Sequence, residues 1–494
     1  MGKKVIIVGG GIAGLSAGVY AQRCGFDAAI LEGHSIAGGN CTSWKRGGYL
    51  FEGGMHWLTG SSKSTMLNKV WRTVGALDDN VAISVNEPFM EFDHHGTPVR
   101  IYRDADATEK HLLELSPEDA DEIKKLCNNV RKVKALTMPV TNIRNVKMTK
   151  KTHPPLSLLL SAFFAFRLMG RFSKIPREQY ISNFKHEGIR DMLRSCTTEK
   201  SGIVPFFFTM GILGSGDGGF PEGGSLPFVG RIVGKFKASG GELICNARVE
   251  RVLVENGKAV GVMAGGSRYE ADAVIVTVDT MVADKLFDPP LKAPWLDKMH
   301  DATVPTMATF VSLGIDADLG KYAHGLVFKL STPITLGTRT HEYLLANNYA
   351  ADPVYSPAGK TAMTLILDGD SYDFWKRARE QDQYKEEKQA LADKVIAALS
   401  EHMPEMKGKV EVCDVATPLT YERYCGNWHG SWMTEMVPSI KISQYPYTVN
   451  GIGNLYFAGQ RIMPPGGLPV ALSTGRTAVQ HLCRDTGTLF VSEE

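Results

Sequence analysis

The chain has 494 residues, which is too long for one hydrophobic core and predicts two or three domains. A net charge of +2 gives no reason to expect nucleic-acid binding, and 43% hydrophobic with 22% charged residues is ordinary for a folded protein. The eight cysteines are scattered without a C-x-x-C pair, which suits a reducing compartment and argues against a disulfide framework or structural zinc. We therefore expect a cytoplasmic protein without a bound metal.

The first forty residues predict a βαβ unit. Residues 4–8 form a continuous apolar, β-branched run, as in a buried strand. The run leads into a G-x-G-x-x-G motif at 9–14, and helical spacing follows over 15–24, with Gly25 as the stop. Residues 26–31 predict a second strand, which ends at Glu32.

This arrangement predicts a dinucleotide site. Gly9 allows the tight turn, Gly11 lets the backbone approach a pyrophosphate, and Gly14 lets helix and strand pack closely. The free N–H groups at the helix start, around Ile12 and Ala13, would hold the phosphates. Glu32 lies where a carboxylate accepts both ribose hydroxyls, and its charge would repel the 2′-phosphate of NADP.

Two other interpretations of glycine-rich or N-terminal sequence are less well supported. The lysines before the first apolar run imitate a signal peptide, but the run is interrupted by the three glycines. A second G-x-G-x-x-G match at 214–219 has no helix starting on its last glycine, since Pro221 intervenes and the expected N-cap is Ser225. We expect no second nucleotide site there.

Further glycines follow the first unit, at Gly38-Gly39-Asn40 and in Phe51-Glu52-x-Gly54-x-His56-Trp57. Two glycine-rich turns would explain them. A long cofactor that passes over the backbone would also need close approach at such positions.

Together, these motifs resemble the FAD-dependent phytoene desaturase, carotenoid isomerase and retinol saturase superfamily, with amine oxidases as more distant relatives. The resemblance implies an extended FAD, with its adenosine at Glu32 and its flavin near Gly54. Many relatives carry Arg or Lys after the double glycine, where this chain has Asn40. This departure and His56 favour the saturase or isomerase side of the superfamily.

The next segment predicts a hairpin over 90–103 and a helix over 116–133 with Ser116 as N-cap. His94 and His95 fall in the hairpin turn, where solvated side chains are more common than metal ligands.

Residues 156–169 form the most apolar stretch, but at about 21 Å a helix of this length is too short to span a bilayer. A buried helix or tunnel wall is the favoured interpretation. An in-plane membrane contact is the alternative, because basic residues flank the stretch: Lys147, Lys150, Lys151, Arg167, Arg171 and Lys174.

The middle of the chain predicts a helix over 226–238 and a hairpin that turns at Asn256-Gly257. The resemblance implies that the backbone at Val249 meets the adenine ring; an ordinary αβ-hairpin insert is the alternative. One long charged helix is expected over 377–402, followed by an aromatic-rich region that includes Tyr424 and Trp428.

The last block predicts a strand over 454–460 and a helix that runs to about Cys483. The resemblance implies that Gln460, after Gly459, bonds the ribityl chain, and that the helix start at Gly467 and Leu468 faces the flavin. The helix dipole would stabilise a reduced, anionic flavin. Nothing marks a covalent flavin attachment, so we expect tight non-covalent FAD.

We expect an α/β fold, in which a Rossmann-like FAD domain of the glutathione-reductase type comes from three segments (1–66, 210–280 and 450–494). An α+β substrate domain would come from the two between them (67–209 and 281–449). The resemblance implies desaturation, saturation or cis–trans isomerisation at C=C bonds of an apolar polyene or isoprenoid. An amine or amino-acid oxidase, or a flavin-binding protein without turnover, are the alternatives. The oligomeric state stays open.

The sequence does not force a catalytic residue. His56 is the candidate proton donor or substrate-positioning group, and a histidine hydrogen-bonded in the domain core is the equal alternative. Trp57, Tyr424 and Trp428 are weaker candidates for the wall of a substrate site.

Overall fold

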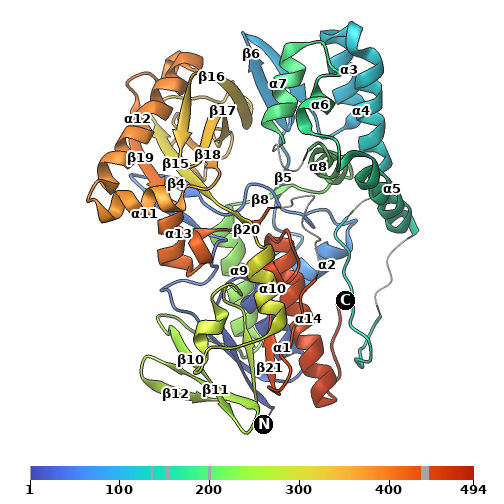
Figure 1. Cartoon of the computed structure of the whole chain (residues 1–494), viewed down its shortest axis with the longest axis vertical. Coiled ribbons are helices and arrows are strands. Elements are labelled where there is room, and N and C mark those ends of the chain that lie inside the picture. The colour runs from blue at the N-terminus through green and yellow to red at the C-terminus, as the bar shows by residue number, and fades with distance from the viewer. Residues whose placement is uncertain (1, 135–136, 152–155, 198–201, 436–443, 494) are drawn as a thin grey trace.

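A computed structural model describes residues 2–134, 137–151, 156–197, 202–435 and 444–493 (Figure 1). The first and last segments of the chain lie in the lower part of the view together with a middle segment that carries α9 and β10 to β12, and the strands β15 to β19 with the helices α3 to α8, α11 and α12 form the upper part. The two parts are built around separate sheets.

The lower part contains a five-stranded parallel sheet in the order β21-β13-β1-β2-β9. Apart from the exposed Lys4 at the start of β1, its central strands β1 and β13 are apolar and buried, as a parallel sheet covered by helices requires. The sheet therefore joins three stretches of chain that are far apart in sequence. Its strands are β1 (Lys4–Val8), β2 (Asp27–Leu31), β9 (Glu242–Ile244), β13 (Ala273–Val276) and β21 (Leu455–Phe457).

Three helices pack around this sheet: α1 (Ile12–Arg23), α9 (Ser225–Ala238) and α14 (Leu468–Thr486). α1 and α14 approach so closely that a Cβ atom on Gly475 would overlap the carbonyl oxygen of Ala13. The C-terminal helix is thus held against the first helix of the chain. Beside them lies an antiparallel sheet of β10 (Val249–Glu255), β11 (Lys258–Ala264) and β12 (Ser267–Glu270).

The upper part contains a seven-stranded mixed sheet in the order β19-β15-β18-β17-β16-β6-β7. The expected hairpin forms its edge as β6 (Met90–His94) and β7 (Thr97–Ile101), and β6 pairs in parallel with β16. The remaining strands are β15 (Ala308–Ile315), β16 (Gly325–Leu336), β17 (Arg339–Asn348), β18 (Thr361–Asp368) and β19 (Val410–Ala416).

Two groups of helices accompany this sheet. α11 (Tyr372–Glu380) and α12 (Tyr384–His402) share a hydrophobic core with the strands from β15 to β19. The second group packs around the edge hairpin: α3 (Ala105–Leu115), α4 (Ala120–Lys132), α5 (Leu156–Phe172), α6 (Arg177–Ile181), α7 (Glu187–Ser195) and α8 (Val204–Gly214).

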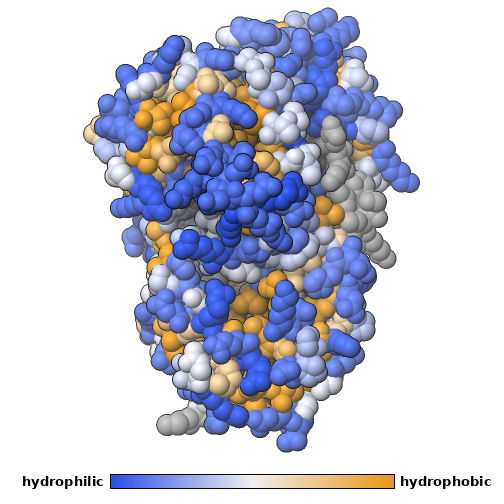
Figure 2. Space-filling view, turned by 60° about the vertical axis from the view of Figure 1, so that its left-hand side comes forward, coloured by the Kyte–Doolittle hydropathy of each residue, from blue (hydrophilic) through white to orange (hydrophobic). Residues whose placement is uncertain are grey.

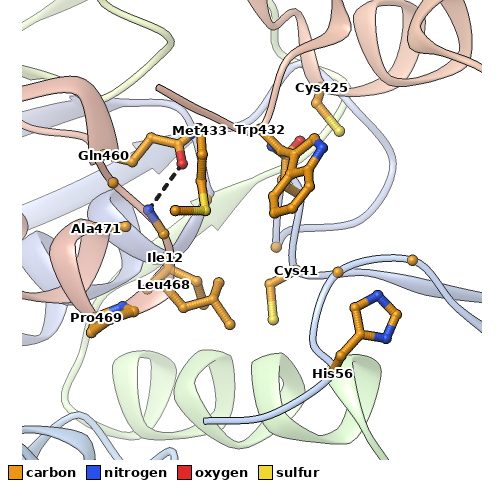
Figure 3. A pocket seen from close by; sticks show the side chains of 18 of the residues that line it. Ile12, Cys41, His56, Cys425, Trp432, Met433, Gln460, Leu468, Pro469 and Ala471 are labelled. Carbon is orange, nitrogen blue, oxygen red and sulfur yellow. Dashed lines mark hydrogen bonds between the residues drawn. The ribbon is translucent and has the colours of Figure 1, made fainter. Parts of the chain in front are cut away.

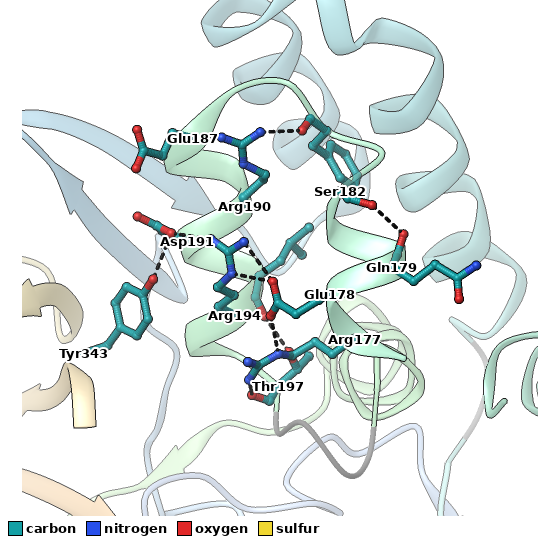
Figure 4. A network of polar contacts seen from close by, with 12 residues as sticks. Arg177, Glu178, Gln179, Ser182, Glu187, Arg190, Asp191, Arg194, Thr197 and Tyr343 are labelled. Carbon is teal, nitrogen blue, oxygen red and sulfur yellow. Dashed lines mark hydrogen bonds and ion pairs between the residues drawn. The ribbon is translucent and has the colours of Figure 1, made fainter. Parts of the chain in front are cut away.

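A buried carboxylate ties the second helix group to the sheet (Figure 4). Asp191 of α7 accepts hydrogen bonds from the Tyr343 hydroxyl (2.8 Å), Arg194 (2.8 Å) and Lys329 (3.3 Å). These partners lower the pKa of Asp191, although burial opposes them. The contacts join α7 to β16 and β17.

The remaining short elements connect these parts. They are β3 (Ser43–Arg46), β4 (Tyr49–Glu52), α2 (Met66–Thr73), β5 (Ile83–Ser84), β8 (Phe220–Pro221), α10 (Pro294–Ala302), β14 (Pro305–Thr306), α13 (Pro418–Cys425), β20 (Met433–Thr434) and, within the described ranges, five short 3₁₀ turns. On the face in Figure 2, hydrophilic side chains form a band between two areas that are richer in apolar residues.

Three local expectations are wrong. The long charged helix is two helices, because Asp382 takes a left-handed conformation (φ 60°) between α11 and α12. Gly224 caps α9, since the Ser225 hydroxyl donates to Glu52 instead. Ser116 precedes a 3₁₀ turn and bonds the side chain of Asp119, so α4 begins later, at Ala120.

The favoured interpretation of the apolar stretch is also wrong. α5 forms as expected, but only a narrow stripe of it is buried against its neighbours α4 and α8. Leu156 and Phe166 are each 72% exposed, and four more large apolar side chains face outward: Leu159, Leu160, Phe163 and Phe164. Among the described residues, no helix has the length and apolarity needed to cross a bilayer.

Candidate functional site

One cavity of about 800 Å³ extends from the carboxyl ends of the parallel strands into the upper part of the molecule. Its walls include Val8, Leu31 and Thr277, at or just beyond the ends of β1, β2 and β13. This edge is where open α/β sheets bind ligands. Every cofactor residue expected from the sequence lines the cavity except Gly14.

The glycine turn has the expected geometry. Gly9 has φ of +100°, and a Cβ on Gly11 would meet nothing within 4 Å, so the backbone there faces open space. A Cβ on Gly14 would overlap the carbonyl oxygen of Gly9, which explains why this glycine serves packing without reaching the cavity. α1 begins at Ile12, and its first free N–H groups therefore point to the cavity.

Glu32, directly after β2, is hydrogen-bonded to the glycine turn that follows β1. Its carboxylate accepts hydrogen bonds from the N–H groups of Gly10 (2.6 Å) and His34 (2.8 Å). Each carboxylate oxygen can accept a second bond, which leaves capacity for two hydroxyl groups. The geometry fits the expected ribose contact.

Two further segments border the path along the cavity. Gly38, Gly39 and Asn40 line it, and Asn40 accepts a hydrogen bond from the Asn427 amide (2.6 Å). A Cβ on Gly54 would overlap the carbonyl oxygen of Asn40, so the two loops meet where only glycine fits. Val249 also lines the cavity, at the start of β10.

The C-terminal block faces these loops. Gly459 and Gln460 follow β21, and the Gln460 side chain accepts a hydrogen bond from the N–H of Gly467 (3.3 Å). Gly467 caps α14, so the helix start at Leu468 borders the cavity. In Figure 3, Leu468 and Ile12 lie on one side of the pocket and His56 on the other. The bond from Gln460 to the ribityl chain stays a prediction.

These residues fit an extended dinucleotide with a flavin at its far end. The open backbone at Gly11, the free acceptor capacity of Glu32 and the start of α14 lie along one continuous cavity. Helix starts at both ends supply positive potential for a pyrophosphate and for a reduced flavin.

Beyond Gly54 the cavity becomes a chamber with a mainly apolar, aromatic wall. Trp57 lines it as expected, together with Phe310 from β15 and Ile366 from β18. The opposite wall comes from the helix group and the edge hairpin, through Phe89, Met90, Ile101, Pro205, Phe206 and Met210.

His56 stands in this chamber as part of a polar cluster. Its Nδ1 lies 3.1 Å from the Tyr349 hydroxyl and 3.4 Å from the Asn347 amide nitrogen. The ring of His324 meets the Tyr349 ring edge-on, at 5.1 Å. Burial and the neighbouring His324 lower the pKa of His56 to about 4, and burial also lowers the pKa of His324. Both imidazoles are therefore neutral at pH 7.

A buried carboxylate holds the loop that carries His56. Glu52 is fully buried and accepts hydrogen bonds from the N–H groups of Gly54 (3.1 Å), Met55 (3.2 Å) and Ser225 (3.0 Å). The hydroxyls of Ser225 (2.5 Å) and Tyr355 (3.4 Å) also donate to it. Burial nevertheless raises the pKa of Glu52.

The second glycine-rich match has a structural role. The buried Asp217 carboxylate within it accepts hydrogen bonds from Gly60, Ser61 and Ser62, in the loop that follows Trp57. Arg103 donates to the backbone carbonyl of Gly218 (3.0 Å). The match therefore braces the chamber wall. A helix, α8, ends at its first glycine, Gly214, where a strand would have to end, and the next helix begins only at Ser225.

Two aromatic residues that the sequence suggested for the wall of a substrate site, Tyr424 and Trp428, do not lie in the chamber. Tyr424 packs against His34 at 5.2 Å, beside Glu32, so it belongs to the opposite end of the cavity from His56 and is not a catalytic candidate. Trp428 stacks on His429 at 4.3 Å and does not line the cavity.

Several cavity residues were missed by the sequence analysis, among them Cys41 and Trp432, which lie between Leu468 and His56 in Figure 3. Burial raises the pKa of Cys41 to about 12, so it remains a thiol. The indole nitrogen of Trp432 is buried without a hydrogen-bond partner in the described structure. His324, Asn347 and Phe310 were also missed, because no local motif marks them.

Comparisons with known proteins show which proteins the chain is similar to. The model of the family described as flavin-containing amine oxidoreductase matches residues 12–483. Prolycopene isomerase 2 of an Oncidium hybrid is 22% identical, over 98% of this chain and 84% of that protein. The lycopene-forming phytoene desaturase of a Paracoccus strain is 22% identical over 98% of both. The all-trans-retinol 13,14-reductase of Danio rerio is 22% identical, over 95% of this chain and 85% of that protein.

The fold also has solved counterparts. A putrescine oxidase variant superposes with a TM-score of 0.63 at 16% identity, over 98% of this chain and 99% of that one. At this level of identity the likeness concerns the fold alone.

Proposed function

Because the chain belongs to the flavin-containing amine oxidoreductase family and its cofactor is FAD, we propose that it acts on C=C bonds of an extended apolar polyene or isoprenoid. It is an FAD-dependent oxidoreductase, and its curated relatives include proteins named for prolycopene, phytoene and all-trans-retinol. When bound, FAD supplies hydride or electron transfer at the substrate.

The observation that carries the proposal is the continuity of the cavity. The dinucleotide path past Gly11 and Glu32 opens, beyond Gly54, into the chamber lined by Trp57 and Phe310. A long, flat, apolar molecule matches an aromatic wall of this kind. The close contact of the Gly54 loop with Asn40 lies where the expected FAD path meets this aromatic wall, so the flavin would lie next to the wall.

His56 is the proposed proton carrier. Saturating a double bond adds a hydride and a proton to the two carbons, and desaturating removes both, so either reaction needs an acid or base beside the substrate. His56 is neutral and borders the chamber, where the Tyr349 hydroxyl and Asn347 fix its ring. Trp57 is proposed as a wall residue only.

An amine oxidase is the less favoured alternative. Its substrate is an ammonium ion in water, and the burial that lowers the pKa of His56 and His324 would also disfavour a cation in the same place. Release of hydrogen peroxide on addition of simple amines would support the alternative and count against the polyene proposal.

A lipid-extract screen tests the proposed function. FAD-loaded protein, oxidised or chemically reduced, is mixed with isoprenoid and carotenoid extracts in single-turnover amounts. We expect a product that differs by two hydrogens, or a geometric isomer of unchanged mass. His56→Gln should slow the conversion of substrate to this product while FAD stays bound. An unchanged rate of conversion would contradict the proposal that His56 carries the proton.

We also propose that α5 binds an anionic membrane surface, from which such a substrate is taken. Six large apolar side chains of α5 face outward, and the sequence from 135 to 177 contains eight Lys or Arg but no Asp or Glu. Apolar insertion beside basic residues suits anionic headgroups. α5 packs on α8, whose Pro205 and Phe206 line the chamber, so one helix separates this surface from the cavity.

Vesicle co-sedimentation tests the membrane contact. The double variant Phe163→Ser/Phe166→Ser should bind vesicles containing phosphatidylglycerol at least about tenfold more weakly than the wild type. The matched control replaces exposed valines elsewhere, Val254→Ser/Val354→Ser, and should bind like the wild type. Equal binding of both variants, or no preference for anionic over zwitterionic vesicles, would contradict the proposal.

A further inference from the structure

The wall of the cavity is exposed to solvent at two places. Among the described residues that line it, four are largely exposed: Ser84, Val85, Arg248 and Tyr424. The first two are neighbours in the chain. Arg248 and Tyr424 are far apart in sequence, yet both lie beside the loop that starts at Glu32, where the adenosine of FAD is expected. An exposed residue in a cavity wall marks an opening, so the adenosine end has an opening of its own.

Arg248 lies at this opening, just before β10. Ala247 donates a backbone hydrogen bond to the carbonyl oxygen of Glu32 (2.8 Å), which fixes this turn beside the end of β2. A Cβ atom on Gly33 would come within 3.5 Å of the guanidinium carbon of Arg248. Within the described ranges, the guanidinium makes no hydrogen bond or ion pair. Its charge and its planar face are therefore available to a ligand.

Tyr424 reaches the same opening from the other part of the molecule. It lies on α13, at the lower edge of the upper part in Figure 1. The rings of Tyr424 and His34 meet at right angles, with their centres 5.2 Å apart. A Cβ atom on Gly426, which caps α13, would lie 3.9 Å from the Arg248 guanidinium. Arg248 and the end of α13 therefore border one opening.

Two hydrogen bonds hold this end of α13 against the cofactor domain. The Asn427 amide donates to the Asn40 side chain (2.6 Å), and the N–H of Trp428 donates to the Asp279 carboxylate (3.0 Å). Both acceptors belong to segments that are expected to bind FAD, 1–66 and 210–280. Tyr424 is thus fixed beside the cofactor path, although it comes from the segment 281–449.

Adenine is the part of FAD that suits these two side chains. It is a flat aromatic ring, on whose faces an arginine or an aromatic side chain packs favourably. We propose that Arg248 and Tyr424 pack against the adenine ring of bound FAD and close this opening.

The contact gives the segment 281–449 a share in holding the cofactor. All cofactor-binding residues expected from the sequence lie in the other segments, 1–66, 210–280 and 450–494. With Tyr424 on the adenine, FAD cannot leave by this opening unless the end of α13 moves away. Because the contact involves only the cofactor, it can be tested without the proposed substrate.

Ultrafiltration of the FAD-loaded protein at a series of dilutions measures the Kd of FAD. The same assay on protein loaded with FMN measures the Kd of a flavin that lacks adenosine. Arg248→Ala and Tyr424→Ala should each raise the Kd of FAD about tenfold, because each removes a contact with the adenine ring. Neither variant should change the Kd of FMN by more than about twofold.

Two conservative variants distinguish a contact with adenine from a structural role. Tyr424→Phe keeps the aromatic ring and should bind FAD within about twofold of the wild type. Arg248→Lys keeps the charge but loses the planar guanidinium, so it should bind FAD nearly as weakly as Arg248→Ala. The control is Arg251→Ala, an exposed arginine on β10 outside the cavity wall, which should leave both Kd values unchanged.

Wild-type affinity for FAD in either alanine variant would refute the contact of that residue. An equal loss of FMN affinity would also refute it, because the variant would then act through the folding of the opening. If FMN binds too weakly to measure, the conservative variants decide: a loss of FAD affinity in Tyr424→Phe as large as in Tyr424→Ala would refute the packing on adenine. If the alanine variants release FAD as expected but no polyene is converted, the proposed function fails and the adenine contact stands.

Discussion

Replacing Glu52 with alanine should remove the central support of the loop that carries His56. The carboxylate, at the end of β4, is the shared acceptor for three backbone N–H groups and two hydroxyls, which come from the following loop, from the start of α9 and from Tyr355. Three of these donors can find other partners when the carboxylate is removed, because the two hydroxyls can rotate and the N–H of Gly54 borders the cavity. The N–H groups of Met55 and Ser225 are buried and would lose their acceptor.

The expected magnitude follows from those two donors. A buried donor without a partner costs about 1.5 kcal/mol, so Glu52→Ala should lower the free energy of unfolding by about 3 kcal/mol. Urea titration of the FAD-saturated protein, followed by tryptophan fluorescence, measures this change. FAD should also bind more weakly, because the Gly54 loop borders its path.

Glu250→Ala is the matched control, since Glu250 is exposed on β10 and should change stability by less than about 0.5 kcal/mol. If Glu52→Ala were no more destabilising than Glu250→Ala, the carboxylate would not support the loop, and the explanation for its burial would be wrong.

Three further predictions follow from single contacts. Glu32→Ala should weaken FAD binding by about 10- to 100-fold in a flavin-fluorescence titration. The control Asp27→Ala, at the exposed start of the strand that precedes Glu32, should leave the affinity for FAD unchanged. Equal affinities of the two variants would contradict the predicted ribose contact. Gly475→Ala should lower the free energy of unfolding by about 1–3 kcal/mol, because the new Cβ would overlap Ala13. Its control, Gly230→Ala, has open space around it in α9 and should raise the free energy of unfolding by about 0.5–1 kcal/mol. Thermal melts that rank the two variants the other way would contradict the α1–α14 contact. Burial raises the pKa of Glu52 in the folded state. The free energy of unfolding of the wild type, relative to that of Glu52→Gln, should therefore be greatest below pH 4.5 and fall as pH rises through the raised pKa. If this difference in free energy grew with pH instead, the pKa of Glu52 would be lowered and not raised.

The parts of the site that the sequence predicts are those with a local code. β1, the glycine turn and Glu32 are contiguous, and each residue type is required by the backbone geometry of its own position. The same holds for Gly459 and Gly467, which precede a 3₁₀ turn and α14. Local requirements of this kind do not depend on the rest of the chain.

The chamber depends on long-range pairing, which leaves no local signal. Phe310, His324 and Asn347 meet His56 only because β15, β16 and β17 pair within one sheet. The aromatic-rich segment around Tyr424 does reach the cavity through Tyr421 and Trp432, whereas Tyr424 itself packs on His34, beside Glu32. Composition therefore identified aromatic segments without showing which of them reaches the chamber.

α5 illustrates a different difficulty. Its buried stripe has helical spacing, at Leu158, Ser161, Ala165, Leu168 and Phe172. The exposed positions are equally apolar, so the pattern does not distinguish the face that packs from the face that is exposed. The break at Asp382 was missed for a related reason, because neither glycine nor proline marks it.

The central claim is that one cavity brings FAD and an apolar polyene together. The most direct measurement is the anaerobic absorbance of the bound flavin near 450 nm during single turnover with a polyene, combined with the mass of the extracted product. We predict that flavin absorbance changes together with a gain or loss of two hydrogens, or that the reduced protein isomerises the polyene at constant mass. A flavin that responds to amines but leaves every polyene unchanged would contradict the account.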